Sequence, residues 1–189
     1  MLEPNRLFFA LWPDEETRAA VHRVARALKV KMQPGGHLSS PERYHITLLF
    51  LGDFVSEDNQ AAAMDAAGRV RCAPFTLRLD RAGSFRNQKI PWWLGASETP
   101  AGVTDLYQIL HDRLLAARVL PERMKFVPHL TILRDARTAL PKTSIGPIDW
   151  TVNEFVLVRS RLDLKPVRYE LLGRWPLTGA PPAAQIPLF

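Results

Sequence analysis

The chain is poor in cysteine, and its hydrophobic runs are short. Cys72 is the only cysteine among 189 residues, so no disulfide can form within the chain, as is usual in a reducing compartment. No stretch reaches the roughly 18 apolar residues that a membrane-spanning helix needs. The apolar run 7–12 ends at Pro13 and a cluster of acidic residues, which makes it too short for the core of a secretory leader. We therefore expect a cytoplasmic protein with neither leader nor membrane anchor.

By contrast, the chain is rich in hydrophobic residues and carries a net positive charge. Hydrophobic residues make up 47% of the chain and the formal net charge is +6, which indicates a globular protein and favours an anionic partner. The length predicts one domain over residues 1–178. The last residues, 179–189, are rich in proline and alanine and are predicted to form an extended tail.

Hydrophobic periodicity predicts the same order of elements in both halves of the chain. The first half is predicted to contain strand 7–12, helix 14–30, strand 44–51, helix 57–70 and strand 75–79. The second half is predicted to contain strand 92–95, helix 103–114, strand 129–133, a loop over 135–149, and strands 154–161 and 168–175. The repeated order predicts two similar lobes related by a pseudo-twofold axis.

One short motif occurs once in each half. His45 and Thr47 flank Ile46, and His129 and Thr131 flank Leu130, in runs that are otherwise apolar. Residues i and i+2 of a strand point to the same face, so each histidine shares a face with its threonine. If the two lobes face each other, both pairs converge on one cleft.

Such a cleft suits the opening of a cyclic phosphate. An in-line displacement needs a base for the attacking water and an acid for the departing oxygen, on opposite sides of phosphorus. Imidazole can fill either role near neutral pH. The hydroxyls of Thr47 and Thr131 can donate hydrogen bonds to the phosphate oxygens, and Arg134, three residues after Thr131, can add charge-assisted contacts.

Two other interpretations compete with catalysis. A single histidine in a strand is commonly a packed core or edge residue, and only the duplication in equivalent strands argues against this. A zinc site would need further ligands, and no third ligand stands at a fixed spacing from His45 or His129. We therefore expect no metal.

At these positions the sequence resembles the two-histidine phosphoesterase superfamily, and within it the LigT-like bacterial RNA 2′,3′-cyclic phosphodiesterases once named 2′-5′ RNA ligases. The resemblance covers nearly the whole chain, in the segments 6–13, 45–52, 128–134, 169–172 and 175–177. It implies a bilobal α+β fold with antiparallel sheets lining a central cleft and helices outside. It also implies no cofactor, with His45 as proton donor and His129 as proton acceptor.

The expected substrate is therefore an RNA or oligonucleotide with a 2′,3′-cyclic phosphate end, opened to a monoester that the family leads us to expect as the 2′-phosphate. Reverse 2′-5′ ligation is open to the same site. Phe85 is a candidate for stacking on a base. We expect a monomer with no obligate protein partner. Two alternatives stay open: a phosphodiesterase for small cyclic nucleotides, and a non-catalytic module that binds RNA or nucleotides.

Overall fold

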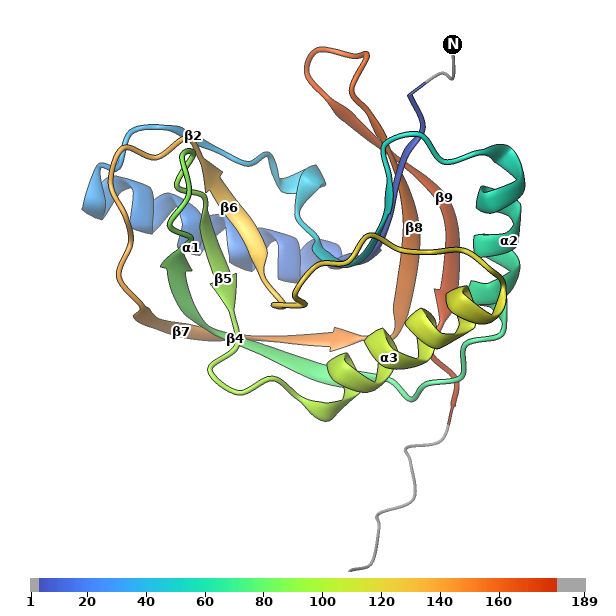
Figure 1. Ribbon diagram of the computed structural model, residues 1–189. Helices are drawn as coiled ribbons and strands as arrows, with labels where there is room; N and C mark the ends of the chain where they lie inside the picture. Colours follow the sequence, from blue (N-terminus) through green and yellow to red (C-terminus); the bar gives the residue numbers. More distant parts are fainter. Residues whose placement is uncertain (1–3, 180–189) are drawn as a thin grey trace, which may run out of the picture.

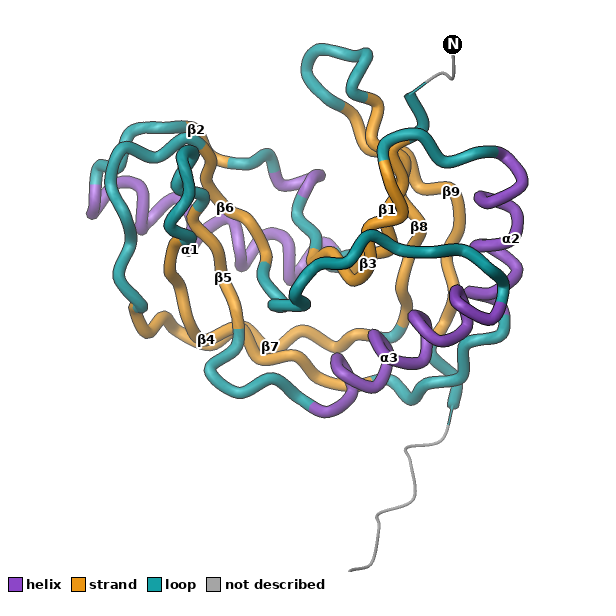
Figure 2. Tube along the Cα trace, viewed as in Figure 1, coloured by secondary structure: helices purple, strands orange, loops and turns teal. Residues whose placement is uncertain are grey.

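The computed structural model describes residues 4–179, which contain both helices and strands (Figures 1 and 2). The helices are α1 (Glu15–Met32), α2 (Glu57–Gly68) and α3 (Ala101–Ala116), with a single 3-10 turn, η1 (Pro41–Arg43). The strands are β1 (Arg6–Leu11), β2 (His37–Leu38), β3 (Ile46–Gly52), β4 (Phe75–Ser84), β5 (Trp92–Gly95), β6 (Leu130–Arg134), β7 (Thr143–Val152), β8 (Glu154–Arg161) and β9 (Arg168–Pro176). No helix within residues 4–179 is both long and apolar enough to cross a membrane.

All of these strands belong to one open, antiparallel sheet with the order β7-β4-β5-β6-β3-β1-β8-β9, and β2 lies against β6. We divide it into a first arm (β3, β1, β8, β9) and a second arm (β6, β5, β4, β7). The arms are joined at a single residue pair, Ile46 of β3 with Leu130 of β6. Each arm begins with a strand of the His-x-Thr motif, so the expected α+β fold with two related antiparallel halves is confirmed.

The two arms do not coincide with the N-terminal and C-terminal halves of the chain. The repeated order of elements had suggested those halves as the two lobes. Strands β8 and β9 come late in the sequence but complete the first arm, whereas β4 comes early and lies in the second. The helices also bridge the arms: α1 follows β1 but contacts β6 and β7, and α3 contacts both β3 and β4 as well as α2 (Figure 1). This exchange ties the two arms together through covalent connections.

The predicted loop over 135–149 is wrong in its second part, because β7 begins at Thr143 and continues through Gly146 and Pro147. Strand β7 is at the edge of the sheet and pairs only with β4. Proline is tolerated in an edge strand, where its nitrogen need not donate to a neighbour. A register shift near Asp80 of β4 accommodates the irregular residues. The short strand β2 was not predicted either.

Most of the predicted helix bounds are close to those observed. Helix α1 was predicted over 14–30 and spans Glu15–Met32. Asp14 caps its first turn, because its carboxylate accepts the N–H of Thr17 at 2.8 Å. The chain leaves the helix through Gln33, which has the left-handed φ of 47°. The predicted tail 179–189 lies outside the described residues apart from Gly179, whose N–H donates to the carbonyl of Cys72.

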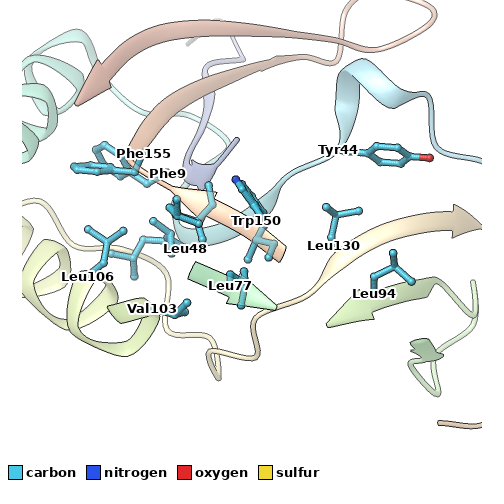
Figure 3. Packing of buried hydrophobic residues seen from close by; sticks show 14 of the residues in the cluster. Phe9, Tyr44, Leu48, Leu77, Leu94, Val103, Leu106, Leu130, Trp150 and Phe155 are labelled. Atoms are coloured by element: carbon cyan, nitrogen blue, oxygen red, sulfur yellow. The ribbon is translucent and has the colours of Figure 1, made fainter. Parts of the chain in front are cut away.

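The main hydrophobic core lies between the sheet and the three helices (Figure 3). A second, smaller cluster lies on the other face of the first arm and is built around Phe8, Ala10, Val156 and Val158. Strand β1 therefore buries both faces, with Phe9 in the main core and Phe8 in the second cluster. This explains why residues 7–12 form a continuous apolar run where a half-exposed strand would alternate.

Candidate active site

The strands β3 and β6 meet with their His-x-Thr motifs side by side. Extending the Ile46–Leu130 register by one residue in each direction sets His45 across from Thr131, and Thr47 across from His129. Residues directly opposite in an antiparallel pair share a face. The side chains of Ile46 and Leu130 are 1% and 0% exposed and point into the core. The two histidines and two threonines are only half-buried and occupy the opposite face, which we call the two-histidine face.

The two histidines occupy diagonal corners of this face. Diagonal neighbours across an antiparallel pair lie about 7–8 Å apart, with their Cβ atoms somewhat closer. That separation leaves room for a phosphate group between two imidazole rings. The pairing of the two strands thus brings both motifs to one face.

Both imidazoles are held in the same way. The Nδ1 atom of His45 lies 2.7 Å from the carbonyl oxygen of Arg43, and the Nδ1 atom of His129 lies 2.7 Å from that of Val127. A carbonyl oxygen only accepts hydrogen bonds, so Nδ1 must carry the proton in both rings. In the neutral state each ring then has its lone pair on Nε2, the atom that is left for proton transfer.

His45 is enclosed by aromatic rings from the second cluster. Its ring centroid lies 5.0 Å from that of Phe8, 5.3 Å from that of Tyr169 and 6.0 Å from that of Trp12, which stacks on it at 17°. The pKa of His45 is lowered to about 4, mainly by burial in these surroundings and to a smaller extent by the positive charge of Arg134. His45 is therefore neutral in the free protein at neutral pH.

His129 has a more open environment. The ring of Phe85 meets it edge-on with centroids 4.7 Å apart, and Trp93 lies beyond Phe85 at 5.8 Å. Burial and then the charge of Arg134 lower the pKa of His129 as well, but the shift is smaller than that of His45. The candidate stacking residue Phe85 thus lies beside a histidine of the two-histidine face.

Arg134 reaches this face because of a bulge. Residues three apart in a regular strand point to opposite faces, which would direct Arg134 away from Thr131. Trp92 pairs with Leu133 and Trp93 with Thr131, so Ile132 has no partner. Ile132 and Leu133 are both fully buried, and the alternation resumes with Arg134 on the Thr131 side. Strand β3 has a comparable register shift against β1, where Leu48 has no partner in that strand.

Two buried donors near this face have no acceptor within residues 4–179. Within residues 4–179, the buried Nε of Arg134 and the buried Nε1 of Trp93 have no hydrogen-bond partner. A buried donor without an acceptor destabilises a protein by about 1–3 kcal/mol. An anionic ligand on this face would supply such acceptors.

The sequence interpretation missed part of the site. It assigned no role to Trp12 or Tyr169, which enclose His45, or to Arg43, whose carbonyl fixes the ring. The only sequence signal for Arg43 was its position two residues before His45. The other histidines lie apart: His22 contacts the hydroxyl of Tyr44, while His37 and His111 neighbour aspartates. Within the described part of the chain, no group of three or more His, Cys, Asp or Glu is arranged to hold a metal ion.

The depressed pKa of His45 has a consequence for stability. The unfolded chain binds a proton at His45 near pH 6.5, whereas the folded protein binds it only near pH 4. The free energy of unfolding should therefore fall as the pH drops from 6.5 to 4, by up to about 3 kcal/mol from this group. Urea unfolding of wild type and His45→Asn across this range measures it, because the difference between the two should shrink or reverse on acidification. A pH-independent difference would contradict it.

Comparisons with known proteins agree with this geometry. A sequence model described as LigT-like phosphoesterase matches residues 11–93. The chain is 35% identical over 181 residues to the RNA 2′,3′-cyclic phosphodiesterase of Escherichia coli, covering 94% of this chain and 99% of that protein. The protein of the same name from Thermus thermophilus is 33% identical, with 92% and 91% covered.

The fold is also found among solved structures. The crystal structure of E. coli LigT complexed with 3′-AMP superposes with a TM-score of 0.79 at 34% identity, covering 93% of this chain and 99% of that one. On the paired motifs, this fold and these relatives, the chain belongs to the LigT-like phosphoesterase family.

Proposed function

We propose that this protein hydrolyses 2′,3′-cyclic phosphate ends of RNA, with His45 as proton donor and His129 as proton acceptor. One observation carries the proposal: both imidazoles have their Nδ1–H fixed by a backbone carbonyl 2.7 Å away, which leaves two Nε2 atoms for proton transfer on one face. A binding module has no need of two rings held in the same tautomer.

The chemistry follows from this arrangement. His129 takes a proton from water as the water oxygen bonds to phosphorus, and His45 gives a proton to the departing ribose oxygen as its bond to phosphorus breaks. Departure of the 3′ oxygen leaves a 2′-phosphomonoester. The hydroxyls of Thr47 and Thr131 and the guanidinium of Arg134 hold the non-bridging oxygens.

The protonation of the two histidines depends on the bound substrate. Burial lowers the pKa of both histidines from the ordinary value of imidazole in the free protein, which favours the neutral form of each ring. A bound phosphate anion favours the charged form of a nearby ring and raises its pKa. The free protein protonates His129 more readily than His45, which is the reverse of the order that the family implies.

RNA as the substrate is supported by the relatives, which are named RNA 2′,3′-cyclic phosphodiesterases. The net charge of +6 favours a polyanion, and Phe85 beside His129 is positioned to stack on a terminal base. The same site run in reverse would join ends through a 2′-5′ linkage. We further propose that the protein acts in the cytoplasm as a monomer.

The proposal is tested with a ribodinucleotide that carries a 2′,3′-cyclic phosphate, in excess EDTA. We expect turnover that exhaustive chelation leaves unchanged, because proton transfer by the two rings requires no metal. Chromatography of the products measures it. Binding of the dinucleotide without turnover would favour the non-catalytic alternative, and activity that is lost on chelation and restored by a metal would contradict the histidine mechanism. Turnover of cyclic mononucleotides alone would favour the small-nucleotide alternative.

A further inference from the structure

Arg43 is a neighbour of His45. It ends the turn η1, and its carbonyl fixes the ring of His45. Its guanidinium carbon lies 5.3 Å from the centroid of Tyr169, and the ring of Tyr169 in turn meets His45 edge-on. The cation–π contact holds the guanidinium over the aromatic ring and restricts its motion.

The charge of Arg43 is not matched by a carboxylate. Within residues 4–179, Arg43 forms no ion pair within 4.0 Å, and its buried Nε has no hydrogen-bond partner. Glu42 is adjacent in sequence, but its lowered pKa is caused mainly by hydrogen bonds from its own backbone and Ser40, with Arg43 the smallest contribution. Arg43 is thus an uncompensated cation with an unused donor.

Arg43 and Arg134 differ in their effects on the pKa values of the two histidines. The charge of Arg134 lowers the pKa of both histidines. The charge of Arg43 lowers only that of His45, and by less than Arg134 does. The contacts agree with this difference: Arg134 extends from the Thr131 side of β6, whereas the guanidinium of Arg43 lies over Tyr169, whose ring contacts that of His45.

We propose that Arg43, held by Tyr169, binds the phosphate on the 5′ side of the terminal nucleotide. The inference rests on the proposed function. A 2′,3′-cyclic end has no substituent beyond its cyclic phosphate, so the next phosphate along the substrate is on the 5′ side. The planar fork of arginine suits two phosphate oxygens at once. The subsite would make the protein favour oligonucleotide ends and 5′-phosphorylated nucleotides over a bare cyclic nucleoside phosphate.

Two matched substrates test this subsite: adenosine 2′,3′-cyclic phosphate, and the same compound with a 5′-phosphate. We expect Arg43→Met to lower kcat/KM for the 5′-phosphorylated compound by ~10-fold or more, as loss of a charge-assisted contact does, and to change the other less than about threefold. Arg43→Lys should recover part of the loss, since it restores the charge without the fork. Arg134→Met should lower kcat/KM for both compounds. Arg23→Met, on the exposed side of α1, should lower neither.

A second measurement separates failure of the subsite from failure of the proposed function. Binding of adenosine 5′-monophosphate, followed by calorimetry, does not depend on turnover and should weaken in Arg43→Met but not in Arg23→Met. Unchanged binding and unchanged substrate preference in Arg43→Met would overturn the subsite. An equal loss on both substrates would also overturn it, because Arg43 would then act on the cyclic phosphate or through His45. Absence of turnover by wild type, with Arg43-dependent binding intact, would overturn the proposed function alone.

Discussion

Replacing His45 or His129 by alanine should each lower kcat by ~10²–10⁴, because each replacement removes one proton transfer from the transition state. The measurement is steady-state turnover of a cyclic-ended ribodinucleotide at saturating substrate. His111→Ala is a matched control, since His111 lies on α3 against Tyr107 and belongs to neither motif. That variant should keep the activity of wild type.

The loss must come from chemistry rather than from unfolding. Far-UV circular dichroism should be unchanged in both variants, and thermal melting at pH 7 should shift by only a few degrees, because both rings are half-buried and each makes one 2.7 Å hydrogen bond to a backbone carbonyl. A folded variant at either position with most of its activity intact would remove that histidine from the mechanism.

A sulfur atom in place of the departing ribose oxygen should restore most of the activity of His45→Ala and little of that of His129→Ala. A ribose alkoxide leaves poorly without a proton, whereas a thiolate leaves without one, so the acid becomes dispensable. The base is needed whenever water attacks. The measurement is the ratio of turnover on the sulfur and oxygen substrates for wild type and both variants.

The pH dependence gives a second readout of the same assignment. The kcat/KM profile of wild type should be bell-shaped, with the alkaline limb lost in His45→Ala and the acidic limb lost in His129→Ala. Rescue of His129→Ala in place of His45→Ala would exchange the roles, in line with the pKa order of the free protein. Rescue of neither would mean that the two rings are not an acid–base pair.

Local pattern was sufficient to predict that each histidine shares a face with its threonine, because the alternation of a strand is a property of a few neighbouring residues. It was also nearly sufficient for the bounds of α1, which was predicted over 14–30 and spans Glu15–Met32. The pairing of β3 with β6 at Ile46 and Leu130 joins residues far apart in sequence. No local signal specifies that register, and the common face of the four side chains depends on it.

Two further features depend on tertiary structure. Strict alternation would direct Arg134 to the core, and only the bulge at Ile132 returns it to the two-histidine face. The proline-containing segment 143–152 is a strand because it is at an edge of the sheet, and a strand's place in a sheet is not encoded in its own residues. The prediction that each half of the chain forms one lobe was wrong for a similar reason. Strand β4 comes from the first half but lies in the second arm, whereas β8 and β9 come from the second half and lie in the first arm.

The central claim is that one ring delivers a proton to one ribose oxygen of a cyclic phosphate held in a fixed orientation. The most direct test is the product of wild-type hydrolysis of a cyclic-ended ribodinucleotide in ¹⁸O-labelled water with EDTA, followed by phosphorus NMR. The account predicts a single product, the 2′-phosphomonoester, with one labelled oxygen on phosphorus. A mixture of 2′- and 3′-phosphates in the uncatalysed ratio, or the same product and rate from a protein lacking both His45 and His129, would contradict it.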